Sequence, residues 1–361
     1  MHPSPSAVSD LTTAYVAQAK AADYARWAQA LMIAGGDSMS AGEIFAKRWP
    51  HSKNLDMIRK AAVTPGSVSG WGEDLSPTRP LASAFIEFLR PRTVLGRLQA
   101  IRRVPFNVSF VAQTGGLGAA WVGEGQPIPV YEGSFERTEF SRSKIAGLCV
   151  LTKDLVRSSD PAAESLVQRD LGAAIIQFSD QQLLDPAVAT LPDVSPASIT
   201  NGATEIESTG STAAAVEADL SAMVGALVTG GIALQSPVWV MKPSTALALA
   251  RLRGTGGARI FPDVGPLGGT IWTIPVITST NAGDQITLID ASEIMVADDG
   301  LELDASDQGT VQLNDAPDAP ATASTVQVSL WQENLVSLRA VRFIRWQRRR
   351  NEAVVWMEVG Y

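Results

Sequence analysis

The chain has 361 residues, of which 45% are hydrophobic, 18% are charged and one is cysteine. A single cysteine excludes an internal disulfide and a cysteine-rich zinc site. The excess of acidic over basic residues gives a formal charge of −8, which argues against a general nucleic-acid-binding protein. No apolar stretch is long enough to cross a bilayer, and the N-terminus lacks a secretory signal pattern, so we expect an intracellularly made protein that binds no membrane.

The length and the low charge also bear on organisation. A chain of this length predicts two or three domains. The charged fraction lies below the roughly 25% of an average soluble domain, which suits a surface covered by partners, so we expect an oligomer. The sequence has two histidines, of which only His51 is a serious candidate base, and this scarcity disfavours histidine-based nucleophilic catalysis.

The first 75 residues predict separate helices. A first helix runs to about Ile33 and stops at Gly35-Gly36. A second begins at Ser40 and ends at Pro50, and a third covers about 54–62. Turn-forming residues follow, so we place a domain boundary near residues 63–76.

A long hairpin is predicted next, after a short helix over residues 81–89. Its outgoing strand is 104–111, its return strand is 135–151, and glycines and prolines at 114–133 form a broad tip. Polar residues occupy both faces of the return strand near the tip, so neither face belongs in a core there. An isolated hairpin is marginally stable in water. We therefore expect an arm that clasps a partner, with a solvated flap as the alternative.

The strongest predicted helix begins at Pro161, where Ser159-Asp160 would supply the N-cap. It runs to about Leu184 and would be a spine of roughly 36 Å. Its apolar residues recur at helical spacing: Val167, Leu171, Ala174, Ile175 and Phe178.

The rest of the chain predicts an α+β lobe and then long extended segments. The expected helices are 213–229 and 243–252, and the expected strands are 237–241, 270–277, 286–289, 294–297 and 301–303. The extended segments 325–346 and 353–359 are expected to pair as a hairpin joined by residues 348–351.

Sequence motifs for cofactor or metal chemistry are lacking. There is no Walker phosphate loop, and the glycine cluster at 116–121 lacks the third glycine of a dinucleotide fingerprint. The acidic run 298–304 lacks the ligand spacing of a calcium loop and favours a charged β-turn. We therefore expect no cofactor, no metal and no enzymatic activity. A hydrolase using the paired carboxylates Asp298 and Asp299 is a remote alternative.

Six arginines fall between Arg339 and Arg350. They could bind phosphate. However, the alternation of residues 339, 341, 343 and 345 with 340, 342, 344 and 346 is typical of a strand. This favours a sheet whose arginines reach carboxylates of neighbouring chains.

Several segments, in this order, resemble the major capsid proteins of tailed bacteriophages. The first group resembles the E-loop and its exit: Gln113-Thr114, Trp121-Val122-Gly123-Glu124-Gly125-Gln126-Pro127-Ile128-Pro129, Phe135, Lys144-Ile145-Ala146 and Leu151-Thr152-Lys153-Asp154-Leu155. The later landmarks are Trp239-Val240-Met241-Lys242-Pro243-Ser244-Thr245, Ile274-Pro275-Val276 with Ser279, Ser329-Leu330-Trp331-Gln332-Glu333-Asn334 and Leu338-Arg339-Ala340. The resemblance covers about residues 80–361 and implies an α+β fold, the Hong Kong 97-type capsid fold.

The resemblance also implies a division of the chain into segments. These are a helical N-terminal extension at 1–75, an N-arm at 76–103, the E-loop at 104–151, a P-domain with the spine helix at 152–212, an A-domain at 213–324 and C-terminal P-domain strands at 325–361. Our candidates for intersubunit contacts are Trp121, Glu124, Arg137, Arg142, Arg339, Arg342 and Arg345.

The function implied is a structural subunit that self-assembles into hexamers and pentamers of an icosahedral shell around double-stranded DNA, which it would contact without sequence specificity. Further implied partners are a portal, a maturation protease or scaffold, and decoration proteins. The protein would reside in the virion after assembly in the bacterial host cytoplasm. The alternative is an encapsulin-type nanocompartment shell protein with the same fold.

Two departures from that family matter. Some members crosslink through an E-loop lysine, but this sequence has no lysine from Ala61 to Ser143, so we expect no crosslink through the E-loop tip. Members also often carry a long, highly charged scaffolding segment that a protease removes. Residues 1–75 are short and modestly charged, and whether they are cleaved in the 63–76 linker is left open.

Overall fold

The structure is a computed structural model that describes residues 22–52, 54–56, 58, 92–113, 120–122, 130, 135–157, 161–254 and 256–360. The chain forms two compact units. Unit 1 contains residues 1–92, 145–177 and 300–342, and unit 2 contains residues 93–144, 178–299 and 343–361. Each unit is thus assembled from three separate stretches of sequence. No helix of the described residues is long and apolar enough to cross a membrane.

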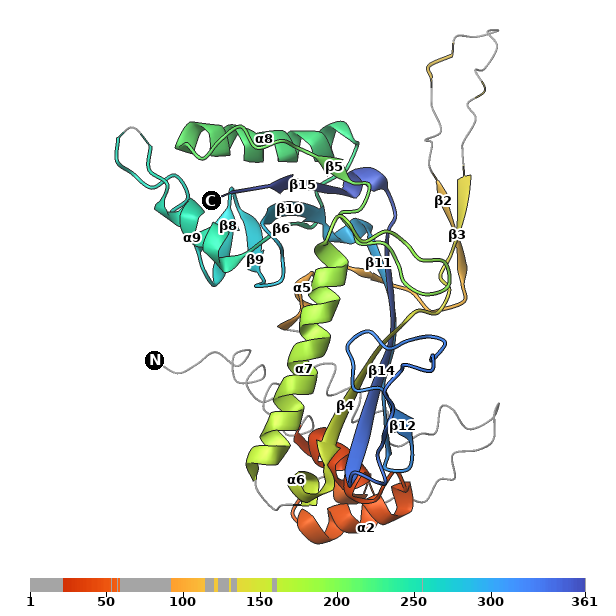
Figure 1. Cartoon of the computed structure of the whole chain (residues 1–361). Coiled ribbons are helices and arrows are strands. Elements are labelled where there is room, and N and C mark those ends of the chain that lie inside the picture. The colour runs from red at the N-terminus through yellow and green to blue at the C-terminus, as the bar shows by residue number, and fades with distance from the viewer. Residues whose placement is uncertain are drawn as a thin grey trace. The chain divides into compact units, whose positions relative to one another are not determined.

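Unit 1 combines helices with residues 145–152, 300–306 and 335–342 of a four-stranded sheet (Figure 1). The strand order of that sheet is β1-β11-β14-β4. Its strands are β1 (Arg102–Arg103), β4 (Lys144–Thr152), β11 (Ile294–Ser306) and β14 (Leu335–Arg348). A separate small pair is β12 (Thr310–Val311) with β13 (Val328–Ser329). The helices are 22–33, α2 (Ser38–Arg48), α6 (Lys153–Arg157) and α7 (Pro161–Leu184).

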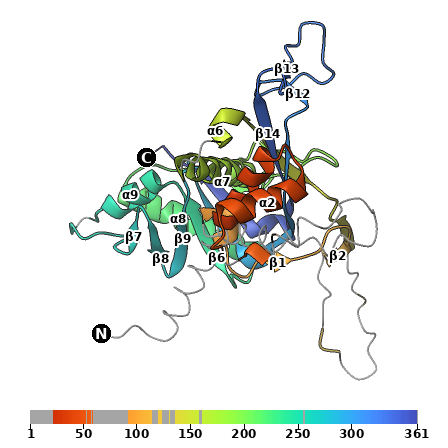
Figure 2. The ribbon, with the colours of Figure 1, turned by 90° about the horizontal axis from the view of Figure 1, so that it is seen from below.

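The N-terminal helices are built into the core of unit 1. Trp27 and Phe45 belong to one buried cluster with Ile175 of α7 and Leu301 of β11, and Figure 2 shows α2 next to α7. The Tyr24 hydroxyl donates to the carbonyl of Leu301 at 3.3 Å. These contacts join residues far apart in sequence, so the helices are part of this unit's core.

Capping explains where α2 begins. The Asp37 side chain accepts from the backbone amides of Met39 and Ser40, at 3.4 and 3.0 Å. An aspartate in extended conformation that accepts such bonds is a strong N-cap. The helix therefore begins at Ser38, two residues before the Ser40 start predicted from sequence.

Unit 2 is built on a seven-stranded sheet of order β5-β15-β10-β6-β9-β8-β7. The strands are β5 (Thr204–Glu205), β6 (Pro237–Met241), β7 (Val264–Gly265), β8 (Gly268–Ile271), β9 (Ile274–Thr278), β10 (Gln285–Asp290) and β15 (Val354–Glu358). The helices and 3-10 turns of the unit include α5 (Val94–Arg97), α8 (Ala213–Thr229), α9 (Pro243–Arg251), η3 (Ala291–Glu293) and η4 (Asn351–Ala353). Figure 1 shows α8 lying along this sheet. Leu220 and Met223 of α8 share one buried cluster with Trp239 and Leu288 of the sheet.

Three strand predictions for the later chain fall on strand residues but have the wrong bounds. The predicted strand 270–277 is two antiparallel strands, β8 and β9, because Trp272 and Thr273 form a turn with positive φ values of 48° and 70°. The predicted strands 294–297 and 301–303 are one strand, β11, so residues 298–300 form no β-turn. Gly300 has a φ of 109°, which glycine permits within the strand.

The predicted C-terminal hairpin does not form. β14 is hydrogen-bonded to β11 and β4, whereas β15 pairs with β10 and β5. The apolar residues Val354, Val355 and Met357 are buried in the core of unit 2 by this pairing. The partner of β15 is thus decided by burial against strands that are distant in sequence, and proximity in sequence does not reveal this.

The long hairpin is shorter than predicted and its return is interrupted. β2 (Ser109–Gln113) pairs antiparallel with β3 (Phe135–Glu139), from Ser109 opposite Glu139 to Gln113 opposite Phe135. The return stretch breaks at residues 140–143, and β4 then joins a different sheet. The outgoing strand begins late because Asn107 adopts a φ of 59° in a turn. The tip residues 114–119, 123–129 and 131–134 lie outside the described residues.

The spine helix α7 has the predicted bounds, but its buried face is partly polar. Ile175 is buried as expected, whereas Phe178 is 46% exposed. Ser179 and Asp180 are buried in place of apolar residues. Asp180 accepts from the Val94 amide and the Ser279 hydroxyl, both at 2.8 Å, within unit 2. These bonds satisfy the carboxylate, which explains why a charged residue occupies a buried position.

Candidate functional site

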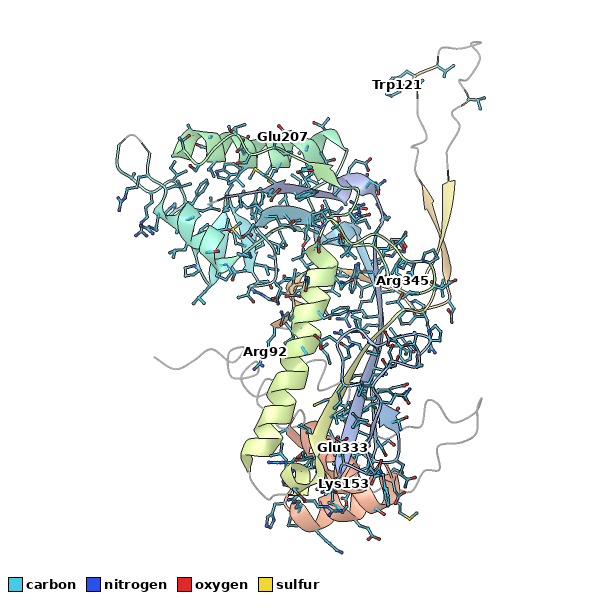
Figure 3. All side chains as sticks on the ribbon, viewed as in Figure 1. Arg92, Trp121, Lys153, Glu207, Glu333 and Arg345 are labelled. Atoms are coloured by element: carbon cyan, nitrogen blue, oxygen red, sulfur yellow. The ribbon has the colours of Figure 1, made fainter. Side chains whose placement is uncertain are left out.

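Among the residues that the structure describes, the most exposed aromatic side chain is Trp121, in the segment that joins β2 to β3. Its relative exposure is 105%, and Figure 3 places it beyond the ends of these two strands. The neighbouring Val122 is also exposed. An indole that is wholly exposed to water contributes nothing to the folded core and has a large apolar surface to bury against a partner. Glu124 lies outside the described residues.

Arg137 and Arg142 lie at the base of the same segment. Arg137 is in β3, where its backbone is opposite Val111; its side chain lies outside the described residues. Arg142 forms an ion pair with Asp299 at 2.6 Å, and its guanidinium carbon is 5.2 Å from the centre of the Phe343 ring. Arg142 therefore ties the end of the hairpin to β11 and β14 within its own chain, while about half of its side chain remains exposed.

The three arginines of β14 have different environments. Arg339 is exposed and pairs with Asp304, and the hydrogen bond that it donates to that carboxylate, followed by the carboxylate's charge, raises the pKa of Arg339. Arg342 is buried, on the same side of the strand as Ala340 and Ile344. The alternation predicted for a strand is thus confirmed, and it places Arg342 on the inner face.

Arg345 is half-buried near the break in the hairpin's return. Its Nη1 donates to the Ser141 and Ser143 hydroxyls, at 2.8 and 3.1 Å. Burial lowers the pKa of Arg345, opposed by the charge of Asp193. Arg345 therefore contacts the residues on either side of Arg142, whereas Trp121 lies apart from Arg345 (Figure 3). The role of all seven residues in intersubunit contact stays a prediction.

One charged cluster of unit 2 was missed from the sequence. Arg349 donates to Glu293 at 2.7 and 3.0 Å, and Arg350 donates to the same carboxylate at 2.9 and 3.4 Å. Burial raises the pKa of Glu293, but the hydrogen bonds and charges of Arg350 and Arg349 outweigh burial and hold the pKa below its ordinary value. The sequence signal was a run of three arginines. The lone glutamate that two of them bind lies more than fifty residues earlier.

The described residues offer no arrangement that suggests catalysis. No group of three or more His, Cys, Asp or Glu side chains among them could hold a metal ion. Asp298 and Asp299 are successive residues of β11. Since side chains alternate along a strand, these two carboxylates point to opposite faces and do not form a catalytic pair. His51 is exposed after α2.

Comparisons with known proteins give consistent findings. A family model described as the phage capsid family matches residues 78–357. The chain is 40% identical over 315 residues to the capsid polyprotein of Pseudomonas phage PAJU2, covering 83% of this chain and 47% of that protein. The chain therefore spans about half the length of that curated relative.

Solved structures share the fold at low identity. A structure from Gordonia phage Cozz matches with a TM-score of 0.56 and 14% identity, covering 74% of this chain and 87% of that chain. One from Mycobacterium phage Bobi matches with a TM-score of 0.55 and 17% identity, covering 74% and 91%. The capsid of a native GTA particle matches with a TM-score of 0.52 and 14% identity, covering 73% and 89%. The predicted α+β capsid fold is confirmed by these similarities.

Proposed function

Because this chain belongs to the phage capsid family and is a structural capsid protein, we propose that it self-assembles into the hexamers and pentamers of an icosahedral shell. The observation that carries this proposal is Trp121, a fully exposed indole on an arm that extends from unit 2. Burying that ring against a neighbouring subunit gives the arm the external support that an isolated hairpin needs.

The contents and partners of the shell are part of the proposal. The shell would enclose double-stranded DNA without reading its sequence, because the net charge of −8 disfavours a tight grip on phosphate. Two of the arginines predicted to contact neighbouring subunits form ion pairs within the chain, Arg142 with Asp299 and Arg339 with Asp304. A portal, a maturation protease or scaffold, and decoration proteins are the further partners, and assembly takes place in the bacterial host cytoplasm. The role that we propose is structural and involves no enzymatic activity.

The encapsulin reading loses support. The relatives and structures reported above are of phages or of a GTA capsid, and none of them points to an encapsulin. Analysis of the contents of a shell purified from the native host distinguishes the two functions, since a phage capsid contains DNA and an encapsulin contains a protein cargo.

Removal of the N-terminus has a structural consequence. A cut in the predicted linker 63–76 would leave residues 22–58 packed in the core of unit 1 through Trp27 and Phe45. We therefore propose that these helices stay bound in mature particles. Mass spectrometry and N-terminal sequencing of purified particles test this; particles that lack the peptide 22–52 altogether contradict it.

The first experiment is negative-stain electron microscopy of the purified chain at high concentration. Closed shells or ring-shaped capsomers are the expected result. A chain that remains monomeric alone, and also when expressed with the portal and scaffold of its own phage, would refute self-assembly. Boiled samples should show single chains on a denaturing gel, because no lysine lies between Ala61 and Ser143 to form a crosslink through the E-loop tip.

A further inference from the structure

The last residue of α9 and the loop that follows it present three arginines to solvent. Arg251, Arg253 and Arg259 are all exposed. Among the residues that the structure describes, no carboxylate lies within ion-pair distance of any of the three guanidinium groups. We call residues 251–259 the basic loop; Thr255 lies outside the described residues.

Backbone hydrogen bonds connect described residues of the basic loop. The Gly254 amide donates to the Ala258 carbonyl at 3.0 Å, and the Gly257 amide donates to the Gly254 carbonyl at 2.9 Å. Arg253 and Arg259 are opposite each other in an antiparallel bridge. Residues opposite each other on such a bridge have neighbouring side chains, and like charges there repel. The fold thus holds two arginines together without a counter-charge of its own.

A set of unpaired carboxylates lies on the same unit. Glu205 is in β5, Glu207 follows it and Glu217 is near the start of α8, and all three are exposed. Within the described part of the chain, none of them has a cationic partner. The Thr209 hydroxyl donates to Asp219 of α8 at 2.7 Å, so the segment that carries Glu207 is fastened to α8 (Figure 3). We call these three residues the acidic edge.

The strand order separates the two charged surfaces. β5 is one outer strand of the seven-stranded sheet and β7 is the other. The acidic edge comprises residues of β5, the segment after it and the first turns of α8, whereas the basic loop leads from the end of α9 toward β7. Opposite charges attached to opposite edge strands of one unit are poised to pair with a second copy. Pairing that repeats head to tail is a heterologous contact, which closes into a ring when the rotation permits.

We propose that the basic loop of one subunit docks on the acidic edge of the next subunit in a capsomer. This inference rests on the proposed self-assembly and names the residues that give each subunit contact its direction. A second copy fits better than DNA because the three arginines of the basic loop match the three glutamates of the acidic edge in number. The net charge of −8 also repels a polyanion.

Charge reversal in the full-length chain tests the proposal. The loop variant carries R251E, R253E and R259E; the edge variant carries E205K, E207K and E217K; the swap variant carries all six. Each triple variant should raise the concentration for half-maximal assembly roughly tenfold, as three exposed ion pairs would. The swap variant should assemble within about twofold of the unaltered chain, because all three pairs are restored with reversed sign.

Further measurements separate this proposal from self-assembly itself. The loop variant mixed with the edge variant should form alternating hetero-oligomers by sedimentation, of which the heterodimer is the smallest, since each loop of one variant then meets an edge of opposite charge on the other. This readout does not require a closed shell. Raising the salt from about 0.05 M to about 0.5 M should weaken this heterodimer. Lys242→Gln is the control, because its partner Asp284 is on the same chain, and it should leave half-maximal assembly unchanged.

Three results would overturn the proposal. In the first, the swap variant fails to recover although circular dichroism shows that it is folded. In the second, no heterodimer forms between the two triple variants. In the third, the loop variant assembles normally but loses binding to a short DNA duplex, which identifies DNA as the partner. A loop variant that assembles normally leaves the shell function intact while refuting this contact.

Discussion

Replacing Glu293 by glutamine removes the negative charge from the cluster with Arg349 and Arg350. Breaking a buried ion pair costs roughly 3–5 kcal/mol, whereas an exposed pair contributes about 0–1 kcal/mol. The Glu293 side chain is only 9% exposed, but the two arginines are 43% and 32% exposed. Because solvent screens these arginines, we expect Glu293→Gln to lower the free energy of unfolding by an amount between the two cases, about 2 kcal/mol.

The sign of the pH dependence follows from the direction of the pKa shift. The folded-state pKa of Glu293 lies below its ordinary value of 4.5 because Arg350 and Arg349 outweigh the effect of burial. The stabilisation is therefore present above the unfolded-state pKa and is lost as the pH falls through the folded-state pKa. The difference between the unaltered chain and Glu293→Gln should be full at neutral pH and should shrink in acid.

Urea unfolding at several pH values, followed by circular dichroism, measures this difference. Hydrogen exchange of peptides from 343–359 adds a local readout, which should show faster exchange in Glu293→Gln. Glu207→Gln is the control, since Glu207 is exposed and has no partner among the described residues. The reasoning would be refuted if the loss in free energy of unfolding stayed constant from neutral pH into acid, or if it were no larger than the loss in the control variant.

Three further substitutions test other parts of the structure. Trp121→Ala should weaken each subunit contact by about 2 kcal/mol or more, which lowers the melting temperature of the shell while that of the isolated subunit is unchanged; an unchanged melting temperature of the shell would remove Trp121 from the interface. Trp27→Ala should cost about 3–5 kcal/mol of subunit stability in urea, because Trp27 is buried in unit 1; a cost below about 1 kcal/mol would contradict that core. Gly269→Ala should cost about 3 kcal/mol or more in urea, since a Cβ there would lie 1.9 Å from the Asp263 carbonyl oxygen. Gly256→Ala, in open space, should change stability by less than about 1 kcal/mol, and an equal loss in both glycine variants would contradict the steric argument.

The candidate contact residues were only partly predictable. The alternation along β14 is a property of neighbouring residues, and it was confirmed together with the strand. The partners of its arginines were predicted on neighbouring chains, yet Arg339 pairs with Asp304 of the adjacent strand. Which carboxylate an arginine meets depends on strand pairing, and the sequence pattern of one strand carries no information on its neighbour.

By itself the sequence determined the elements whose signals are local. α7 begins at Pro161, α8 covers 213–229 and β6 covers 237–241, as predicted. Proline position, capping residues and apolar spacing act within a few residues of each element, so they can be read directly. The order of the capsid-like segments was readable for the same reason.

Only the tertiary structure decided which strands are neighbours and where the polar groups find partners. β15 pairs with β10 and not with β14, and Glu293 gathers Arg349 and Arg350 from across unit 2. These choices bury apolar faces and satisfy backbone and charged groups between residues far apart in sequence. The free energy of such contacts belongs to the whole arrangement, so no short stretch of sequence contains it.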